Sequence, residues 1–292
     1  MKRTLVAAAA CLLPLAAGAS AQQMPQADPF RGQAGMMEIA LPPRVAARQA
    51  ELLAAALGGL QAQRPGRTDV YVLAASFWSD PVFEREATQA AQILSRRLHA
   101  EGRTIVLSAG TGSGERAYAA TTPNNVNAAL GRIGALIDPN EDLVVLFFTS
   151  HGAPDGSIAI REHNRMGGVL RPVNLRDALT DAGIRSRVVI VSACYSGAFI
   201  APLMNEDTII LTAAAPDRTS FGCQPTREWT YFGDAYFGQA LAGGAGIVQG
   251  FEQAQQTIAQ WEREQNLQPS NPQRSVGARA AALVQRAERG AR

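Results

Sequence analysis

The sequence predicts an α/β fold, a three-layer α/β/α sandwich built around a mostly parallel sheet. Unbroken apolar runs at 143–148 and 188–191 are rich in β-branched residues, which is typical of strands buried on both faces of a sheet. Segments with helical spacing of apolar residues alternate with such runs, and this alternation favours parallel strands joined by crossover helices. With 292 residues, 47% of them hydrophobic, the chain can also bury one large core.

The expected elements follow one another regularly along the chain. A helical pattern at 44–63 stops at the breaker cluster 64–66, and the run at 69–75 then predicts the first core strand. A turn at 153–156 and the short run at 157–161 predict a small hairpin. The remaining patterns predict strands at 103–107, 143–148, 188–191 and 207–213, and helices at 82–100, 124–137, 173–182, 229–242 and 251–265.

The N-terminus has the three parts of a secretory signal, which we expect at residues 1–21. Two basic residues precede an apolar stretch at 5–17, and the small residues at 19–21 are typical of a cleavage site. This predicts an exported protein, periplasmic or secreted, whose mature chain begins near Gln22. Cys11 leaves lipidation as an alternative. No later apolar run is long enough to span a membrane.

The charge of the mature chain narrows the classes of partner. Removal of the signal deletes two positive charges and no acids, so the formal net charge falls from +2 to 0. A neutral chain has no electrostatic reason to bind nucleic acid or an anionic membrane surface. The sequence leaves the oligomeric state open.

We expect three parts after the signal. Residues 22–66 form an N-terminal extension, flexible at first and helical later, which either packs on the domain or shields its active site. Residues 67–262 form the main α/β domain. Residues 263–292 form a C-terminal tail rich in Arg and Ala, separated from the preceding helix by the breakers at 268–272.

The two apolar runs each lead to one reactive side chain. The first is followed by His151 and the second by Cys194, and turn residues come after both. Ligands collect at the carboxyl ends of strands in open α/β sheets, so the two side chains are expected at one edge. A base and a nucleophile together favour covalent acyl chemistry. Taken singly, a structural histidine and a small buried cysteine are the alternatives.

Three ordered motifs resemble those of the legumain-like cysteine peptidases, the C13 peptidase family within the caspase-like group. They are Ser150-His151-Gly152, then Ser192-Ala193-Cys194-Tyr195-Ser196-Gly197, and Thr212–Cys223 with Thr230–Asp234. The resemblance implies a caspase-like fold with Cys194 as nucleophile and His151 as general acid–base. It also implies an oxyanion hole made by the N–H groups of Gly152 and Cys194.

The resemblance also implies a third catalytic residue. Trp78-Ser79-Asp80 is similar to the family's Trp-x-Asn, whose Asn orients the catalytic histidine. A carboxylate can replace that carboxamide as the acceptor, which makes Asp80 a candidate. The alternative is that Asp80 shapes the turn before Pro81.

The substrate pocket departs from the family pattern. The resemblance places Ser192, Ser220 and Asp234 in the pocket that binds the substrate side chain, but the family's Arg and Glu positions hold Val82 and Ser192. The residue after the nucleophile, commonly Glu, is Tyr195. We therefore expect a P1 residue that donates hydrogen bonds or is basic. Arg85, one helical turn beyond Val82, is the alternative partner for Asp234.

Other interpretations of the reactive residues are kept open. His163 and Cys223, with the two catalytic candidates, match no zinc-ligand spacing, so no metal or other cofactor is expected. A disulfide between Cys194 and Cys223 would inactivate the enzyme.

The glycine-rich loop at 108–114 lacks the Walker spacing and its Lys, so it is expected to be an ordinary surface loop rather than a phosphate-binding loop. The predicted function is a cysteine endopeptidase whose expected partner is a peptide or protein substrate; a transpeptidase and a non-catalytic binding protein of the same fold are the alternatives.

Overall fold

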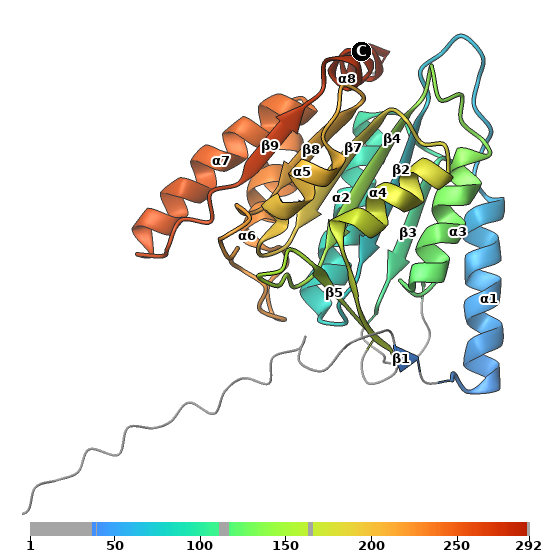
Figure 1. Cartoon of the computed structure of the whole chain (residues 1–292), viewed down its shortest axis with the longest axis horizontal. Helices are drawn as coiled ribbons and strands as arrows, with labels where there is room; N and C mark the ends of the chain where they lie inside the picture. The colour runs from blue at the N-terminus through green and yellow to red at the C-terminus, as the bar shows by residue number, and fades with distance from the viewer. Residues whose placement is uncertain (1–36, 39, 111–116, 163–165, 291–292) are drawn as a thin grey trace, which may run out of the picture.

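The computed structural model describes residues 37–38, 40–110, 117–162 and 166–290, and it has the predicted α/β/α architecture (Figure 1). The helices are α1 (Pro43–Gly58), α2 (Pro81–Arg97), α3 (Pro123–Gly134), α4 (Pro172–Asp181), α5 (Ile200–Leu203), α6 (Tyr231–Gly233), α7 (Ile247–Glu264) and α8 (Ala278–Gly290). A 3₁₀ turn η1 (Ser196–Phe199) and a π-helical segment η2 (Asp234–Leu241) complete them. The strands are β1 (Met37–Glu38), β2 (Val70–Ser76), β3 (Thr104–Ser108), β4 (Leu143–Thr149), β5 (Ile158–Glu162), β6 (Met166–Leu170), β7 (Arg187–Ser192), β8 (Thr208–Thr212) and β9 (Gln273–Val276).

The central sheet has six strands in the order β3-β2-β4-β7-β8-β9. The first five are parallel, and β9 pairs antiparallel with β8. The chain moves outward from β2 to β3 and then crosses back to β4, so β4 lies in the middle next to β7. The carboxyl ends of these two central strands therefore meet at one edge of the sheet.

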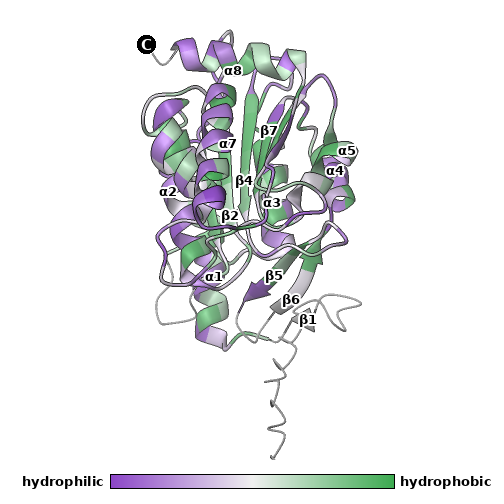
Figure 2. Ribbon diagram, turned by 90° about the vertical axis from the view of Figure 1, so that its left-hand side faces the viewer, coloured by the Kyte–Doolittle hydropathy of each residue, from purple (hydrophilic) through white to green (hydrophobic). Residues whose placement is uncertain are grey.

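Two helical layers cover the sheet because its side chains alternate between two buried faces. Val145 and Phe147 of β4 pack in the cluster that includes residues of α2, η2, α7 and α8. Val144 and Leu146 pack in the other cluster, with residues of α3, α4 and α5 and the partly buried leucines of α1. Figure 2 shows β4 as hydrophobic along its length, whereas α2 and α7 alternate between hydrophilic and hydrophobic residues.

Proline residues define where four of the helices begin. Pro43, Pro81, Pro123 and Pro172 each occupy the first position of a helix. The first turn of a helix has no intrahelical acceptor for its N–H groups, so the missing N–H of proline costs nothing there and its fixed φ favours the helix. Pro81 is the important case for function, because it begins α2 directly after Asp80.

The C-terminal region differs from the prediction. Residues 263–292 were expected as a tail outside the domain, but β9 completes the sheet and α8 packs Leu283 and Val284 into the core. The helix expected at 229–242 is a short α6 followed by the π-helical η2. The arginines of α8 are exposed, whereas Glu288 is half-buried and accepts from the N–H of Ile247 at 2.7 Å.

A second, smaller sheet follows His151. Gly152 and Ile158 form an antiparallel bridge across the predicted turn, and β5 continues into a three-stranded sheet of order β1-β6-β5. The predicted signal at 1–21, with Cys11, lies outside the described residues. Among the residues that the structure describes, no helix is both long and apolar enough to cross a membrane.

Candidate active site

The ends of β4 and β7 bring the two reactive residues to the same place. Thr149 and Ser192 are the last paired residues of the two strands, and the N–H of Ser150 donates to the carbonyl of Ser192 at 3.2 Å. His151 and Cys194 each lie two residues beyond this last pair. The parallel register therefore places the imidazole and the thiol at neighbouring strand ends, as the sequence predicts.

His151 is held between two aromatic rings at the start of α2. Its ring meets Trp78 at 4.9 Å and Phe83 at 5.0 Å between centroids, both edge to face. Its Nε2 lies 3.8 Å from a carboxylate oxygen of Asp80, a distance longer than a hydrogen bond. Burial lowers the pKa of His151 below its usual value, and the negative charge of Asp80 partly offsets this shift.

Asp80 is free to act on His151 because it does not cap its own helix. It is the residue immediately before α2, a position where aspartate usually accepts a hydrogen bond from the first turn. Its side chain makes no such capping bond. The structure therefore places the Asp80 carboxylate beside the imidazole.

Cys194 lies in a turn with strained backbone geometry. The residue that follows it, Tyr195, has a left-handed φ of 57°, which is uncommon for a side chain of this size. The N–H of Tyr195 is fixed by the carbonyl of Arg218 at 2.7 Å. The N–H of Ser220 points at the Cys194 sulfur at 3.2 Å, and such a donor stabilises negative charge on that atom.

Two backbone N–H groups next to the thiol have no acceptor among the described residues. They belong to Gly152 and Cys194, the pair predicted to form the oxyanion hole. The bridge between Gly152 and Ile158 is closed by the neighbouring N–H groups of Ala153 and Ala159, so it does not use that of Gly152. Both donors are thus available to a substrate oxygen.

The predicted pocket residues have distinct surroundings. Ser192 is buried, and its hydroxyl lies 3.2 Å from that of Thr230. Asp234 is partly exposed at the start of η2, and it accepts from the amide of Gln239 at 3.2 Å. Ser220 contacts the Cys194 sulfur through its backbone and its hydroxyl.

Arg85 does not turn toward Asp234. It pairs with Glu228, the Nε and carboxylate oxygen lying 3.3 Å apart, and donates to the carbonyls of Pro225 and Arg227. It therefore ties α2 to the loop before α6. The carboxylate of Asp234 has no cationic partner among the described residues.

The two thiols outside the signal are both free. Cys223 packs against a small apolar cluster that includes Trp78, Val82 and Phe83. Burial raises the pKa of Cys223, with smaller contributions from the charges of Cys194, Asp80 and Glu86. Among the described residues, no three His, Cys, Asp or Glu side chains gather as metal ligands; His163 lies outside those residues.

One acidic residue at the site was missed by the sequence analysis. Glu86 of α2 is fully buried, and its carboxyl group accepts hydrogen bonds from the hydroxyls of Thr149 and Thr230. Burial raises its pKa to about 7. The sequence carries no signal for this burial, because Glu84 and Arg85 directly before it give the segment the pattern of a solvent-facing helix surface.

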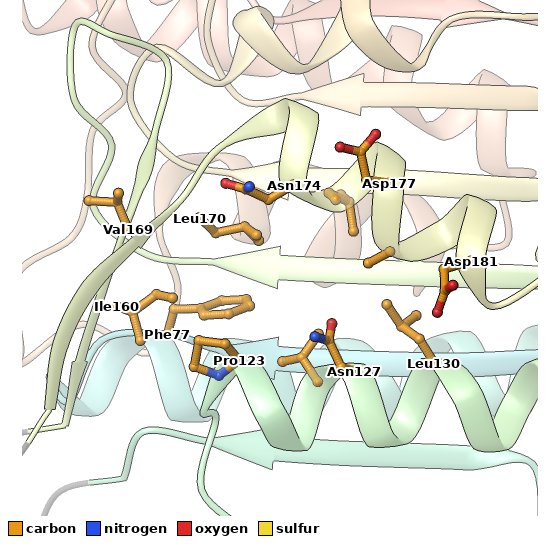
Figure 3. Close-up of a pocket in the computed structure, with 13 residues that line it drawn as sticks. Phe77, Pro123, Asn127, Leu130, Ile160, Val169, Leu170, Asn174, Asp177 and Asp181 are labelled. Atoms are coloured by element: carbon orange, nitrogen blue, oxygen red, sulfur yellow. The ribbon is translucent and has the colours of Figure 1, made fainter. Parts of the chain in front are cut away.

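A cavity of about 500 Å³ lies on the other face of the sheet, between α3 and α4 (Figure 3). Its walls include Leu130, Leu170 and Leu175, with Asp177 and Asp181 at the side of α4. Phe77 lines it, while the next residue, Trp78, packs on His151. The cavity thus backs onto the loop that carries the active-site tryptophan, but none of the catalytic candidates lines it.

Comparison with known proteins places these residues in a family. The model described as the Peptidase C13 family matches residues 114–281, a range that contains His151 and Cys194. No curated protein matches the chain significantly. Among solved structures, the fold is similar to the crystal structure of caspase-1 from Spodoptera frugiperda, with a TM-score of 0.47 and 13% sequence identity over 74% of this chain and 89% of that chain.

Proposed function

The chain belongs to the peptidase C13 family, and from this we propose that it is an exported cysteine endopeptidase. It cleaves peptide bonds through an acyl-thioenzyme formed on Cys194, with His151 as general acid–base. The observation that carries the proposal is the register of β4 and β7, which puts both residues two positions beyond the pair Thr149–Ser192. Export rests on the predicted signal at 1–21.

The reaction follows from the roles of these groups. The thiolate of Cys194 attacks the substrate carbonyl carbon, and the N–H groups of Gly152 and Cys194 bind the oxygen that becomes negative. His151, as imidazolium, then gives its proton to the leaving amine, and the C–N bond breaks. In the second half, His151 takes a proton from water, which attacks the thioester and restores the thiol.

Asp80 supports this cycle through His151. Its carboxylate favours the imidazolium form, which burial between Trp78 and Phe83 disfavours. Asp234 is the group of the pocket that meets the substrate side chain, and its carboxylate favours a P1 residue that donates hydrogen bonds or carries positive charge.

The test combines labelling with cleavage. An electrophilic peptide, such as a peptidyl chloromethyl ketone, is expected to label Cys194 alone, and mass spectrometry of the digested protein identifies the modified residue. Cleavage of a proteome-derived peptide library by the same preparation gives the P1 preference. Added amines that appear joined to the products would indicate transpeptidation. Absence of both labelling and cleavage would support a non-catalytic binding protein.

A further inference from the structure

A row of hydroxyl side chains ends the strands at the catalytic edge of the sheet. Ser108, Ser76, Thr149 and Ser192 are the last residues of β3, β2, β4 and β7, and they are paired in register across the sheet. Because side chains alternate along a strand, all four lie on the face covered by α2. At one end of the row, Ser108 donates to Glu84 of α2.

At the other end, the carboxyl group of Glu86 lies between the two catalytic strands. It accepts from Thr149 of β4, and its Oε1 lies 3.5 Å from the hydroxyl of Ser192 of β7. Thr230, which precedes α6, also donates to Oε1, at 2.5 Å. The backbone of Gly233 approaches so closely that a Cβ there would lie 1.9 Å from Oε1. One carboxyl group therefore joins three separate segments.

Two of these segments lead directly to the reactive side chains. Thr149 is two residues before His151, and Ser192 is two residues before Cys194. The third segment, anchored through Thr230, leads into Asp234. The Glu86 carboxyl group thus links the strand ends that lead to the imidazole and the thiol, contacting Thr149 through Oε2 and Ser192 through Oε1.

From these contacts, and on the basis of the proposed function, we infer that Glu86 is a positioning residue of the active site. It fixes the separation of His151 and Cys194 by holding Thr149 and Ser192, and it contacts no substrate atom itself.

Packing alone does not account for a carboxyl group at this position. Glu86 is fully buried, and the groups that contact it are hydroxyls rather than a cation. Burying an ionisable group without a charged partner costs free energy. An apolar side chain of similar size would fill the space between α2 and the sheet without that cost. What it would not do is accept hydrogen bonds from two strands at once.

Glu86→Gln tests the inference with little change in shape. We expect the variant to fold, to keep KM within about threefold, and to lose roughly ten- to a hundredfold in kcat, since small displacements of reacting groups have effects of that size. Alkylation of Cys194 by iodoacetamide, which needs no substrate pocket, should slow as well. Glu262→Gln is the matched control, because Glu262 is also buried but accepts from the N–H of Ser270, away from the site.

A second pair of variants keeps the test decisive if Glu86→Gln fails to fold. Thr149→Val removes the hydrogen bond from Thr149 to Glu86 and leaves the carboxyl group in place. Thr212→Val, at the end of β8, is the control, because the Thr212 hydroxyl donates to the carbonyl of Ala214 instead. We expect lower kcat only for Thr149→Val. The losses from Thr149→Val and Glu86→Gln should be less than additive when combined, because both remove the same contact.

Two outcomes would overturn the inference while leaving the proposed function intact. One is an active wild-type enzyme with unchanged kcat in both Glu86→Gln and Thr149→Val. The other is a lowered melting temperature in these variants with kcat restored at a lower assay temperature, which would make Glu86 a purely structural residue. An inactive wild-type protein that no electrophile labels would instead reject the proposed function.

Discussion

Gly152 and Cys194 face each other so closely that a side-chain carbon on residue 152 would lie 1.8 Å from the carbonyl oxygen of Cys194. Real Cβ atoms are not found at such distances, so the residue after His151 must be glycine for the turn after β7 to lie where it does. The same contact holds the N–H groups of both residues near the thiol. The position of the Cys194 backbone therefore requires glycine at residue 152.

Gly152→Ala is therefore expected to separate the two strand ends. Overpacking of this kind costs about 1–3 kcal/mol of folding free energy, and displacement of the oxyanion donors should lower kcat about a hundredfold or more. Denaturant unfolding and peptide cleavage measure the two effects. Gly131→Ala in α3 is the control: a Cβ there meets nothing within 4 Å, so stability should rise slightly and activity should not change.

The two thiols should differ in their effect on turnover. Cys194→Ala is expected to abolish peptide cleavage, whereas Cys223→Ala should retain most of it, because Cys223 packs beside Val82 and Phe83 and does not end a catalytic strand. Cleavage rates of both variants, together with the number of thiols that an electrophile labels in each, show which cysteine is required for turnover. Equal loss in the two variants would contradict the assignment of the nucleophile.

Removal of the Asp80 charge should lower the pKa of His151 further. Burial lowers this pKa, and the negative charge of Asp80 partly offsets the shift. In Asp80→Asn only the effect of burial is left, so the imidazolium loses its proton at a lower pH. NMR titration of the His151 ring in a Cys194→Ala background, with and without Asp80→Asn, measures the shift. We also expect kcat to fall roughly tenfold in the active enzyme. A pKa that is unchanged or higher in the variant would show that Asp80 only shapes the turn.

The pocket should favour basic P1 residues. Asp234 has no cationic partner among the described residues, and Arg85 is engaged with Glu228. Arg or Lys at P1 should therefore be accepted at least as well as Asn, with Asp and Glu rejected. Asp234→Asn should lower kcat/KM for basic P1 substrates roughly ten- to a hundredfold, about 1.4–2.7 kcal/mol. Strict Asn preference that disappears in Arg85→Ala would refute this interpretation.

Glu86 should make folding stability depend on pH. Its pKa in the folded protein is about 7, above the ordinary 4.5, because burial disfavours the charged form. The folded protein keeps this proton at pH values where the unfolded chain has lost it, so the free energy of unfolding falls as pH rises from about 4.5 to 7. The fall amounts to about 3 kcal/mol, and Glu86→Gln should remove it.

Comparing the wild-type protein with Glu86→Gln isolates the contribution of Glu86 to the pH dependence of the free energy of unfolding. The Cys223 thiol interacts electrostatically with Glu86, but its raised pKa lies above this pH range. His151 acts in the opposite direction, because its lowered pKa makes stability fall at acidic pH, but it is present in both proteins. Urea unfolding of wild type and variant at several pH values from 4.5 to 8 gives the difference. Parallel curves for the two proteins would contradict the buried, ionisable state of Glu86.

The central strands were predictable because their apolar runs are long and end at distinctive residues. The runs before His151 and Cys194 correspond to β4 and β7, buried at every position. β9 was not predictable in this way. Its sequence Gln273-Arg274-Ser275-Val276 has no apolar run, and half-exposed side chains alternate with exposed ones, so pairing with β8 rather than burial makes it a strand.

Glu86 could not be assigned from the sequence for a related reason. In a helix, a glutamate beside other charged residues has the pattern of a solvent-facing position. Its burial depends on how α2 lies across β2 and β4, which local patterns do not encode. The hydroxyls that it contacts, Thr149 and Ser192, are likewise typical of strand ends in general. Only the register between strands shows that they belong together.

The position of β9 in the sheet bears on when the sheet is completed during synthesis. Residues 273–276 leave the ribosome after every other strand of the sheet, and until then β8, the neighbour of the strand that leads to Cys194, has one unpaired edge. An open edge of this kind attracts other extended chains. A chain still being synthesised thus holds Cys194 next to an unfinished sheet, and the sheet is completed only after residues 273–276 have been made.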